Sequence, residues 1–383
     1  MTNPEIRALR KELHKHPELS GAEFNTAERI QRFVQKHHPT KIITNIGGEG
    51  LAAVYEFSKT GLTIAIRCEL DALPIHEENQ FGHQSTVRGV SHKCGHDGHM
   101  AIVAGLIFWL KEKNFKHGKI VLLFQPAEET GEGAFKVLQD ERFKKLDIDY
   151  MFALHNIPGE TLHSILTMDK GFSAEVQSFS IALTGKESHA SEPENGINPA
   201  LAMAEITIEL AKLNIRTPLD ENFAILTPVH GVMGQKSYGI SPAHGELHYT
   251  IRTWNSEKMN ILKTALEHIF TRICQENGLN YETDWFEHFP ASTNDRECNN
   301  YVIEAARENG FEVIEKPFPF KFGEDFGWFS KKYKTTMFGL GAGNDTSALH
   351  NADYDFPDEI IETGMNMFAT IISKLLPVLP NLK

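Results

Sequence analysis

The sequence predicts an α/β protein of two domains: a mixed sheet with helices on both faces, and an inserted α+β domain of ferredoxin-like topology. Three observations lead to this prediction. The chain has 383 residues, which exceeds the size of one ordinary hydrophobic core. Short apolar runs alternate with helical patterns in its first part, and several runs end in carboxylate or imidazole side chains. Between Met168 and Phe286 the order of elements becomes β-α-β-β-α-β.

The larger domain is predicted to open with two amphipathic helices, because apolar residues recur at helical spacing over 3–16 and 22–36. An apolar segment over 98–112 predicts a third helix. Short apolar runs predict the strands of this part, which are 42–46, 51–57, 62–67, 119–124 and 150–154. The elements expected after the insertion are helix 299–309, strand 311–315, a helix near Gly323, strand 335–339 and helix 358–376.

The segment 168–286 is predicted to form the inserted domain. Its alternating and helical patterns predict strand 174–184, helix 198–213, strands 223–232 and 246–254, helix 256–277 and strand 279–286. The remaining residues, 1–167 and 287–383, are assigned to the larger domain.

The composition is that of a globular protein and excludes several classes of function. A formal net charge of −13 argues against a nucleic-acid partner, because an acidic surface repels phosphates. The first residues are charged and lack the apolar core of a secretory signal, and no segment approaches the length of a membrane span. We therefore expect a cytoplasmic protein that does not associate with a membrane. Its four cysteines are expected to be reduced, since they show no pairing pattern.

The segment 90–100, V-S-H-K-C-G-H-D-G-H-M, concentrates side chains that bind metals. Cys94 and His96 lie two residues apart and can point at one ion from an extended loop, while Asp97 can hold an imidazole from behind. A lone cysteine or histidine is usually just buried. The density of ligand types in one loop nevertheless favours a transition-metal site.

Further carboxylates and histidines follow the predicted strands. Glu69 and Asp71 come after one strand, Glu128 and Glu129 after the next, and His155 after a third. Charged residues at strand ends are common, and the glutamate pair could be solvated. Beside a metal, however, one glutamate could bind the ion while the other acts as general base. These residues would then meet at the carboxyl edge of an open α/β sheet.

Seven motifs in order over nearly the whole chain resemble the metal-dependent amidohydrolases of metallopeptidase family twenty, closest to its hippurate hydrolase and N-acyl-amino-acid amidohydrolase branch. The motifs are E-L-D-A-L-P-I, H-K-C-G-H-D-G-H, F-Q-P-A-E-E, A-L-H-N, G-K-E-S-H-A, G-E-D-F and L-H-N-A-D-Y-D-F-P-D-E. The resemblance implies a zinc-peptidase-like catalytic, metal-binding domain formed by 1–167 and 287–383. It also implies that 168–286 is a lid and dimerisation domain.

The resemblance further implies residue roles. The ligands of two divalent ions would be Cys94, His96, Glu129, His155 and His350, the last of which lies in a long Gly-rich loop. Glu128 would be the general base, and Asp71 would orient a ligand. His189 would reach toward the substrate carbonyl, in relatives often across a dimer interface. Such a ligand mixture accommodates zinc, manganese, cobalt or nickel.

The chain departs from the family pattern at several positions. Glu69 and Asn198 stand where relatives usually carry Asp, and Lys93 stands where a small residue is usual. The segment 238–242, from Tyr238 through Gly239, replaces one that supplies an asparagine to the substrate carboxylate in many relatives. Arg252 could pair with that carboxylate instead, although a surface cation is the alternative interpretation.

The remaining histidines are interpreted mainly as structural. Those on or near the first two helices are expected to be solvated or packed, and they are His14, His16, His37 and His38. His244 and His248 share a face of one strand, but no third ligand is near in the sequence. For His99 a packing role is favoured over one as the partner of a metal ligand.

We therefore expect a hydrolase that cleaves the amide bond of N-acylated amino acids, or of small amino-acid conjugates, with a metal-activated water and Glu128 as general base. A dinuclear carboxypeptidase or dipeptidase acting on small peptides is the first alternative. A non-catalytic metal-binding relative is the second, and the retention of Glu128 argues against it. Acetyl, benzoyl, aminobenzoyl and indole-acyl substrates all fit this chemistry.

Overall fold

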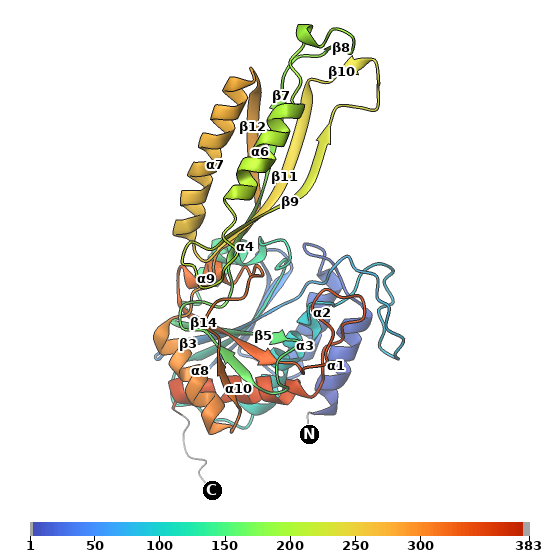
Figure 1. Cartoon of the computed structure of the whole chain (residues 1–383). Helices are drawn as coiled ribbons and strands as arrows, with labels where there is room; N and C mark the ends of the chain where they lie inside the picture. The colour runs from blue at the N-terminus through green and yellow to red at the C-terminus, as the bar shows by residue number, and fades with distance from the viewer. Residues whose placement is uncertain (1–2, 378–383) are drawn as a thin grey trace. The chain divides into compact units, whose positions relative to one another are not determined.

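The computed structural model describes residues 3–377, which divide into two compact units (Figure 1). Unit 1 comprises the chain up to Phe172, Ser292–Pro319 and the residues from Glu324 onward. Unit 2 comprises Ser173–Ala291 and Phe320–Gly323. None of the described helices is both long and apolar enough to cross a bilayer.

The strands of unit 1 are β1 (Lys41–Ile46), β2 (Gly50–Glu56), β3 (Thr63–Glu69), β4 (Lys119–Gln125), β5 (Tyr150–Ile157), β6 (Ile165–Thr167), β13 (Val313–Glu315) and β14 (Lys334–Gly341). Its helices are α1 (Pro4–Lys15), α2 (Phe24–Gln35), α3 (His96–Leu110), α4 (Gly133–Gln139), α5 (Glu141–Lys144), α8 (Arg296–Glu308), α9 (Gly327–Ser330) and α10 (Ile360–Leu375). The sequence did not predict β6, α4 or α5, which are all short. The helix expected near Gly323 begins later and has only four residues.

The eight strands form one mixed sheet in the order β1-β2-β4-β3-β5-β14-β6-β13. In its centre, β4, β3, β5 and β14 run parallel, so their carboxyl ends meet at one edge. The register aligns Glu69 with Gln125 and His155 with Gly339. This alignment brings the segments that follow the four strands together, as the sequence predicts.

The alternation of side chains along β3 sorts the two faces of the sheet. Ile64, Ile66 and Cys68 belong to the core that the sheet shares with α1, α3 and α10. Arg67 points to the opposite face, where α4 and α9 contact each other and the strands β4 and β14. Each face of the sheet is therefore covered by its own helices. The buried guanidinium of Arg67 lies on the face that α4 and α9 cover.

Unit 2 has the ferredoxin-like sheet order that the sequence predicts, β12-β7-β11-β9, and all pairs are antiparallel. Its elements are β7 (Glu175–Thr184), β8 (Ser188–His189), α6 (Ala200–Lys212), β9 (Ala224–Met233), β10 (Ile240–Ser241), β11 (His244–Thr253), α7 (Ser256–Glu276) and β12 (Asn280–Phe289). The helices α6 and α7 pack on one face of this sheet (Figure 1). The two-residue pair β8–β10 was not predicted.

The unit boundaries differ from the predicted domain boundaries by a few residues. Residues 168–172 lie in unit 1, whereas 287–291 and 320–323 lie in unit 2. The strand β12 continues past the predicted end at Phe286, and Phe289 still pairs with Val176 after a register shift. Ser173 forms an isolated bridge with Phe320, which joins that short segment to unit 2.

Candidate metal centre

Five side chains that the sequence singled out meet at the carboxyl edge of the unit 1 sheet. Ligand atoms of Cys94, His96 and His155 lie within 4.8 Å of one another, and so do those of Cys94, Glu129 and His350. The two groups share the Cys94 sulfur. The Cys94 Sγ lies 3.4 Å from His155 Nε2, and His350 Nε2 lies 3.9 Å from Glu129 Oε2.

Backbone carbonyls set the orientation of two imidazoles. The Nδ1 of His96 lies 3.0 Å from the carbonyl oxygen of Asp71, and the Nδ1 of His155 lies 2.9 Å from that of Asn156. A carbonyl can only accept, so each Nδ1 carries a proton and each Nε2 is the nitrogen left to bind a metal. Both Nε2 atoms face the cluster, which is the arrangement required of metal-binding histidines.

Asp71 is held beside the ligands by contacts from three segments. Its Oδ2 accepts hydrogen bonds from the Ser20 hydroxyl at 2.7 Å and from the Glu129 backbone N–H at 2.9 Å. Its Oδ1 lies 3.4 Å from His96 Nδ1. The carboxylate of Asp71 thus contacts one candidate ligand through its ring and another through its backbone, which suits a residue that orients ligands.

Glu128 lies buried next to the same cluster. Its Oε2 is 3.8 Å from His96 Nε2, and its Oε1 accepts a hydrogen bond from the Asp325 backbone N–H at 3.3 Å. Burial raises the pKa of Glu128 well above its usual value, and the neighbouring carboxylates of Glu324 and Glu129 raise it further. A carboxylate with a raised pKa beside a reaction centre can accept a proton and later return it.

Local backbone conformation presents these side chains. Gly95, between the two ligands of the first loop, has φ 96° and forms the N-cap of α3. A Cβ at this position would lie 2.4 Å from Asn156 Oδ1, so only glycine fits. Ala127, just before the glutamate pair, has φ 51°, and its N–H donates to Glu23 at 2.7 Å. Strained backbone of this kind is frequent at functional sites.

The residues present fit a pair of divalent metal ions. The buried atoms His96 Nε2 and Glu129 Oε1 have no hydrogen-bonding partner among the described residues. Burial raises the pKa of Cys94 well above its usual value and that of Glu129 to about 7. Because metal ligands must be deprotonated, a bound cation would reverse both shifts. Thiolate, imidazole and carboxylate together form a donor set typical of zinc and neighbouring transition metals.

A buried arginine compensates the carboxylates behind Glu128. The Arg67 guanidinium is fully buried and lies 3.0 Å from Glu324 and 2.7 Å from Asp325, and it also contacts Glu69. Asp325 accepts further hydrogen bonds from the Gln125 amide and from the Ala134 backbone N–H. Glu324 and Asp325 belong to the motif G-E-D-F. The sequence analysis gave these two residues no role in the site. Their role could have been suspected from the sequence, because two adjacent acidic residues stand directly before an aromatic residue.

Replacing Arg67 by methionine is expected to lower the free energy of unfolding by about 3–5 kcal/mol, because the carboxylates would remain buried without their cation. The measurement is urea unfolding of the metal-free protein. Arg32→Met is the control, since Arg32 pairs with Glu28 on the surface and its loss should change little. Equal stabilities of the two variants would contradict this role of Arg67.

Glu69, which departs from the family pattern, reaches a second partner. Its Oε2 lies 2.7 Å from His99 Nδ1, and His99 Nε2 lies 2.6 Å from the side-chain oxygen of Asn156. The Asn156 amide in turn donates to the Tyr354 hydroxyl at 2.6 Å. His99 therefore belongs to a buried chain of hydrogen bonds, and its ring packs edge-on against that of the candidate ligand His155.

His14 forms a second buried network, and it is packed rather than solvated. Its Nδ1 lies 2.8 Å from Asp97 and its Nε2 lies 2.9 Å from Glu77. Burial alone would lower the pKa of His14, but the two carboxylates raise it to about 9, against an opposing effect of Arg10. Asp97 thus binds an imidazole, as expected, although the imidazole comes from α1 and not from a metal ligand.

This network predicts a pH dependence of stability. The folded pKa of His14 lies above its ordinary value of 6.5, so its stabilising effect is complete below pH 6.5 and is lost as the pH rises through 9. The wild-type protein should lose about 3 kcal/mol more than His14→Gln between pH 6.5 and 9.5. Urea unfolding of metal-free protein at both pH values measures the difference. His16→Gln should behave as wild type, and parallel profiles for wild type and His14→Gln would refute the assignment.

The other N-terminal histidines lie apart from the cluster. His37 packs against Phe33 and Phe108, His38 is exposed, and His16 approaches Glu12 at 3.3 Å. Within residues 3–377 none of them joins a group of ligand atoms close enough to hold an ion.

His189 and Arg252, the two residues assigned to the substrate, belong to unit 2. His189 is exposed in β8, and its Nδ1 lies 2.6 Å from the Ser191 hydroxyl. Arg252 is partly buried and donates from Nη1 to the Lys321 carbonyl at 2.7 Å. This contact argues against a merely solvated cation. Tyr238, in the segment that departs from the family, is 94 % exposed.

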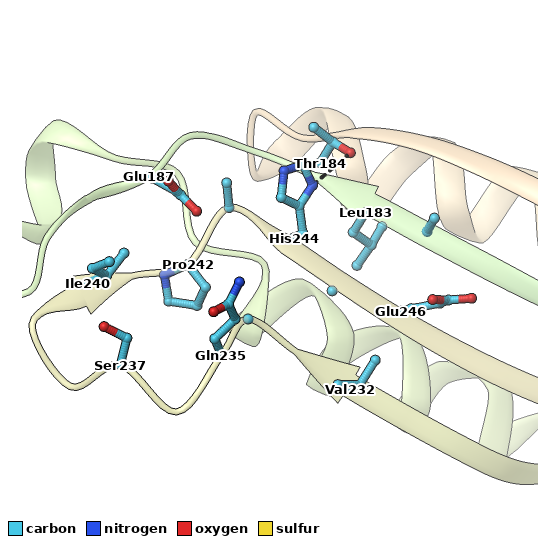
Figure 2. Close-up of a pocket in the computed structure, with 14 residues that line it drawn as sticks. Leu183, Thr184, Glu187, Val232, Gln235, Ser237, Ile240, Pro242, His244 and Glu246 are labelled. Atoms are coloured by element: carbon cyan, nitrogen blue, oxygen red, sulfur yellow. Dashed lines mark hydrogen bonds between the residues drawn. The ribbon is translucent and has the colours of Figure 1, made fainter.

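A cavity of about 540 Å³ in unit 2 lies between the ends of β7, β9 and β11 (Figure 2). His244 lines this cavity, and its Nδ1 lies 3.4 Å from the Thr184 hydroxyl. His248 contacts Glu246 at 2.8 Å, and its ring packs edge-on against that of His230 across the strand pair. The sequence missed His230 as a neighbour, because it lies on β9. In the described part of the chain these histidines form no metal-binding group.

Comparison with known proteins finds relatives and solved structures that match nearly the whole chain. The N-acetyl-L-cysteine deacetylase of Bacillus subtilis (strain 168) is 31% identical to this chain over 353 residues, which cover 91% of this chain and 83% of that protein. The hippurate hydrolase of Campylobacter jejuni is 27% identical over 376 residues, or 97% of each protein. A crystal structure of the Bacillus subtilis YXEP protein, a dinuclear metal binding peptidase from the M20 family, has a TM-score of 0.83, 27% identity and 98% coverage of both chains.

A family model for peptidase family M20/M25/M40 matches residues 65–374, which is most of the chain. This match confirms the resemblance that the seven motifs indicated, and the structures agree in fold over almost their whole length. The chain therefore belongs to peptidase family M20/M25/M40 and is a metal-dependent amide hydrolase.

Proposed function

We propose that the protein hydrolyses the amide bond of N-acylated amino acids or small amino-acid conjugates, using two divalent ions held by Cys94, His96, Glu129, His155 and His350. The observation that carries this proposal is the pair of ligand groups that share the Cys94 sulfur, with Glu128 beside them. Two relatives are named for N-acetylcysteine and for hippurate, which are both N-acylated amino acids. This similarity favours acylated amino acids over peptides.

In this proposal different residues of unit 1 transfer the proton and orient the ligands. Bound divalent ions supply the Lewis acidity that polarises an amide carbonyl and acidifies water. Glu128 accepts the proton of the attacking water and returns it to the leaving nitrogen, while the Asp325 N–H holds its carboxylate in place. Asp71 keeps His96 and Glu129 oriented.

In this proposal two residues of unit 2 recognise the substrate. His189 donates a hydrogen bond to the carbonyl oxygen as negative charge develops there. Arg252 pairs with the substrate carboxylate, and its contact with Lys321 uses only one of its five N–H donors. It would thereby replace the asparagine that the segment around Tyr238 lacks.

The test is metal analysis of the purified protein together with a hydrolysis screen. Acetyl, benzoyl, aminobenzoyl and indole-acyl amino acids are compared with dipeptides in the presence of manganese, zinc, cobalt or nickel. About two ions per chain and amine release from acylated amino acids are the expected results. Hydrolysis of dipeptides alone would replace the proposal by the peptidase alternative. Bound metal without any turnover would indicate a non-catalytic relative.

We also propose that the protein forms a homodimer through the inserted domain. In unit 2 the strand β9 lies at an edge of the sheet, and Val229, Val232 and Met233 on it are exposed. An exposed apolar edge strand is a template for pairing with another chain. Light scattering should give twice the mass of one chain, and the mass of a monomer would refute the dimer.

A further inference from the structure

Lys93 stands directly before the candidate ligand Cys94. Its side chain is completely buried. The Nζ donates to Glu77 Oε1 at 2.6 Å, to Asn79 Oδ1 at 2.7 Å and to the carbonyl oxygen of Tyr354 at 2.7 Å. All three ammonium hydrogens therefore have an acceptor, and a carboxylate balances the buried charge.

The backbone of Lys93 binds the other end of the segment that its side chain reaches. The Lys93 carbonyl accepts the His350 N–H at 2.8 Å, and the Tyr354 N–H closes a turn onto Asn351 at 3.1 Å. His350 has φ 67°, which residues other than glycine rarely adopt. One residue thus holds both ends of the segment 350–354 and stabilises an uncommon backbone conformation at His350.

The segment that carries the acceptors Glu77 and Asn79 also forms hydrogen bonds with the segment 350–354. The Glu78 N–H donates to the Ala352 carbonyl at 3.0 Å, and the Asn79 amide donates to the Asp353 carbonyl at 2.8 Å. The segment 77–79 and the loop of His350 are therefore joined by hydrogen bonds around Lys93. Cys94 is covalently attached to Lys93, so its position relative to His350 depends on these bonds.

We propose that Lys93 is a positioning residue that sets the placement of His350 relative to Cys94, and thereby the affinity of the ion bound by Cys94, Glu129 and His350. This inference rests on the proposed function, because it assumes that these residues bind metal. The inference goes beyond the proposed function, because it states that the affinity for one of the two ions depends on Lys93, which is not itself a ligand. Residues that hold ligands from behind typically change metal affinity 10–100-fold.

The experiment is a cobalt titration of metal-free wild type, Lys93→Met and His350→Ala, followed by calorimetry and by the thiolate-to-cobalt absorption of Cys94. The wild type should bind two ions. In Lys93→Met one ion should bind as in the wild type and the other about 10–100-fold more weakly. This selective loss should fall on the same ion as in His350→Ala. Lys316→Met is the matched control, since the Lys316 ammonium is also held by a carboxylate, that of Glu160, at 2.6 Å.

Wild-type affinity for both ions in folded Lys93→Met would overturn the proposal, and so would an equal weakening of both ions. If Lys93→Met does not fold, Asn79→Ala removes one acceptor and leaves the buried Lys93 ammonium paired with Glu77. It should weaken the same ion selectively, and an unchanged affinity would overturn the proposal. A wild-type protein that binds no cobalt would instead refute the metal centre, which separates failure of the proposed function from failure of this inference.

Discussion

Replacing Glu128 by glutamine should lower kcat about 10²–10⁴-fold, because the amide cannot take a proton from water. The substitution keeps the shape of the side chain, and glutamine can still accept the Asp325 N–H at the position of Oε1. It also removes one of the carboxylates that repel each other in this site, so folding should not suffer. Metal content should remain at the wild-type value, because Glu128 is not among the proposed ligands.

Steady-state kinetics on the best substrate of the screen, with metal analysis of each preparation, measure this effect. Glu132→Gln is the control, since Glu132 lies four residues along the chain and its carboxylate pairs with Lys136 on the surface. It should keep wild-type kcat. Substantial turnover by Glu128→Gln with full metal content would show that another group accepts the proton.

Removing the metal with a chelator should abolish hydrolysis and destabilise the protein. A ligand that binds only the folded state at 1,000 times its Kd stabilises that state by about 4 kcal/mol. The effect should be pronounced here because burial opposes the charged forms of Glu129 and Cys94 when no cation is present. Thermal unfolding of chelated protein, before and after addition of manganese, zinc, cobalt or nickel, measures the difference.

Cys94→Ala separates this effect from general ion binding. The sulfur of Cys94 is common to both ligand groups. Its loss should therefore reduce the increase in Tm that metal addition causes, whichever of the two groups holds the ion. Restored activity should accompany the restored Tm in the wild type and be absent from the variant. Full activity of the chelated wild type would contradict the metal centre as a whole.

The sequence by itself determined which chemistry the chain carries and where along the fold it lies. Runs such as β3 and β4 could be recognised from short-range apolar patterns, since these depend only on the local period of the chain. The position of Asp71 and of the pair Glu128–Glu129 after such runs then predicted one common edge. The ligand types at this edge follow directly from residue identity.

Only the tertiary structure decided how those residues are held. Arg67 and Asp325 are 258 positions apart in the chain, and His14 and Asp97 are 83 apart, yet each pair is in contact. No local period relates such residues, so their pairing follows from packing alone. Lys93 appeared in the sequence only as a departure from a family pattern. Its importance emerged from its burial, because a charge removed from water requires partners, and the fold supplies them from distant segments.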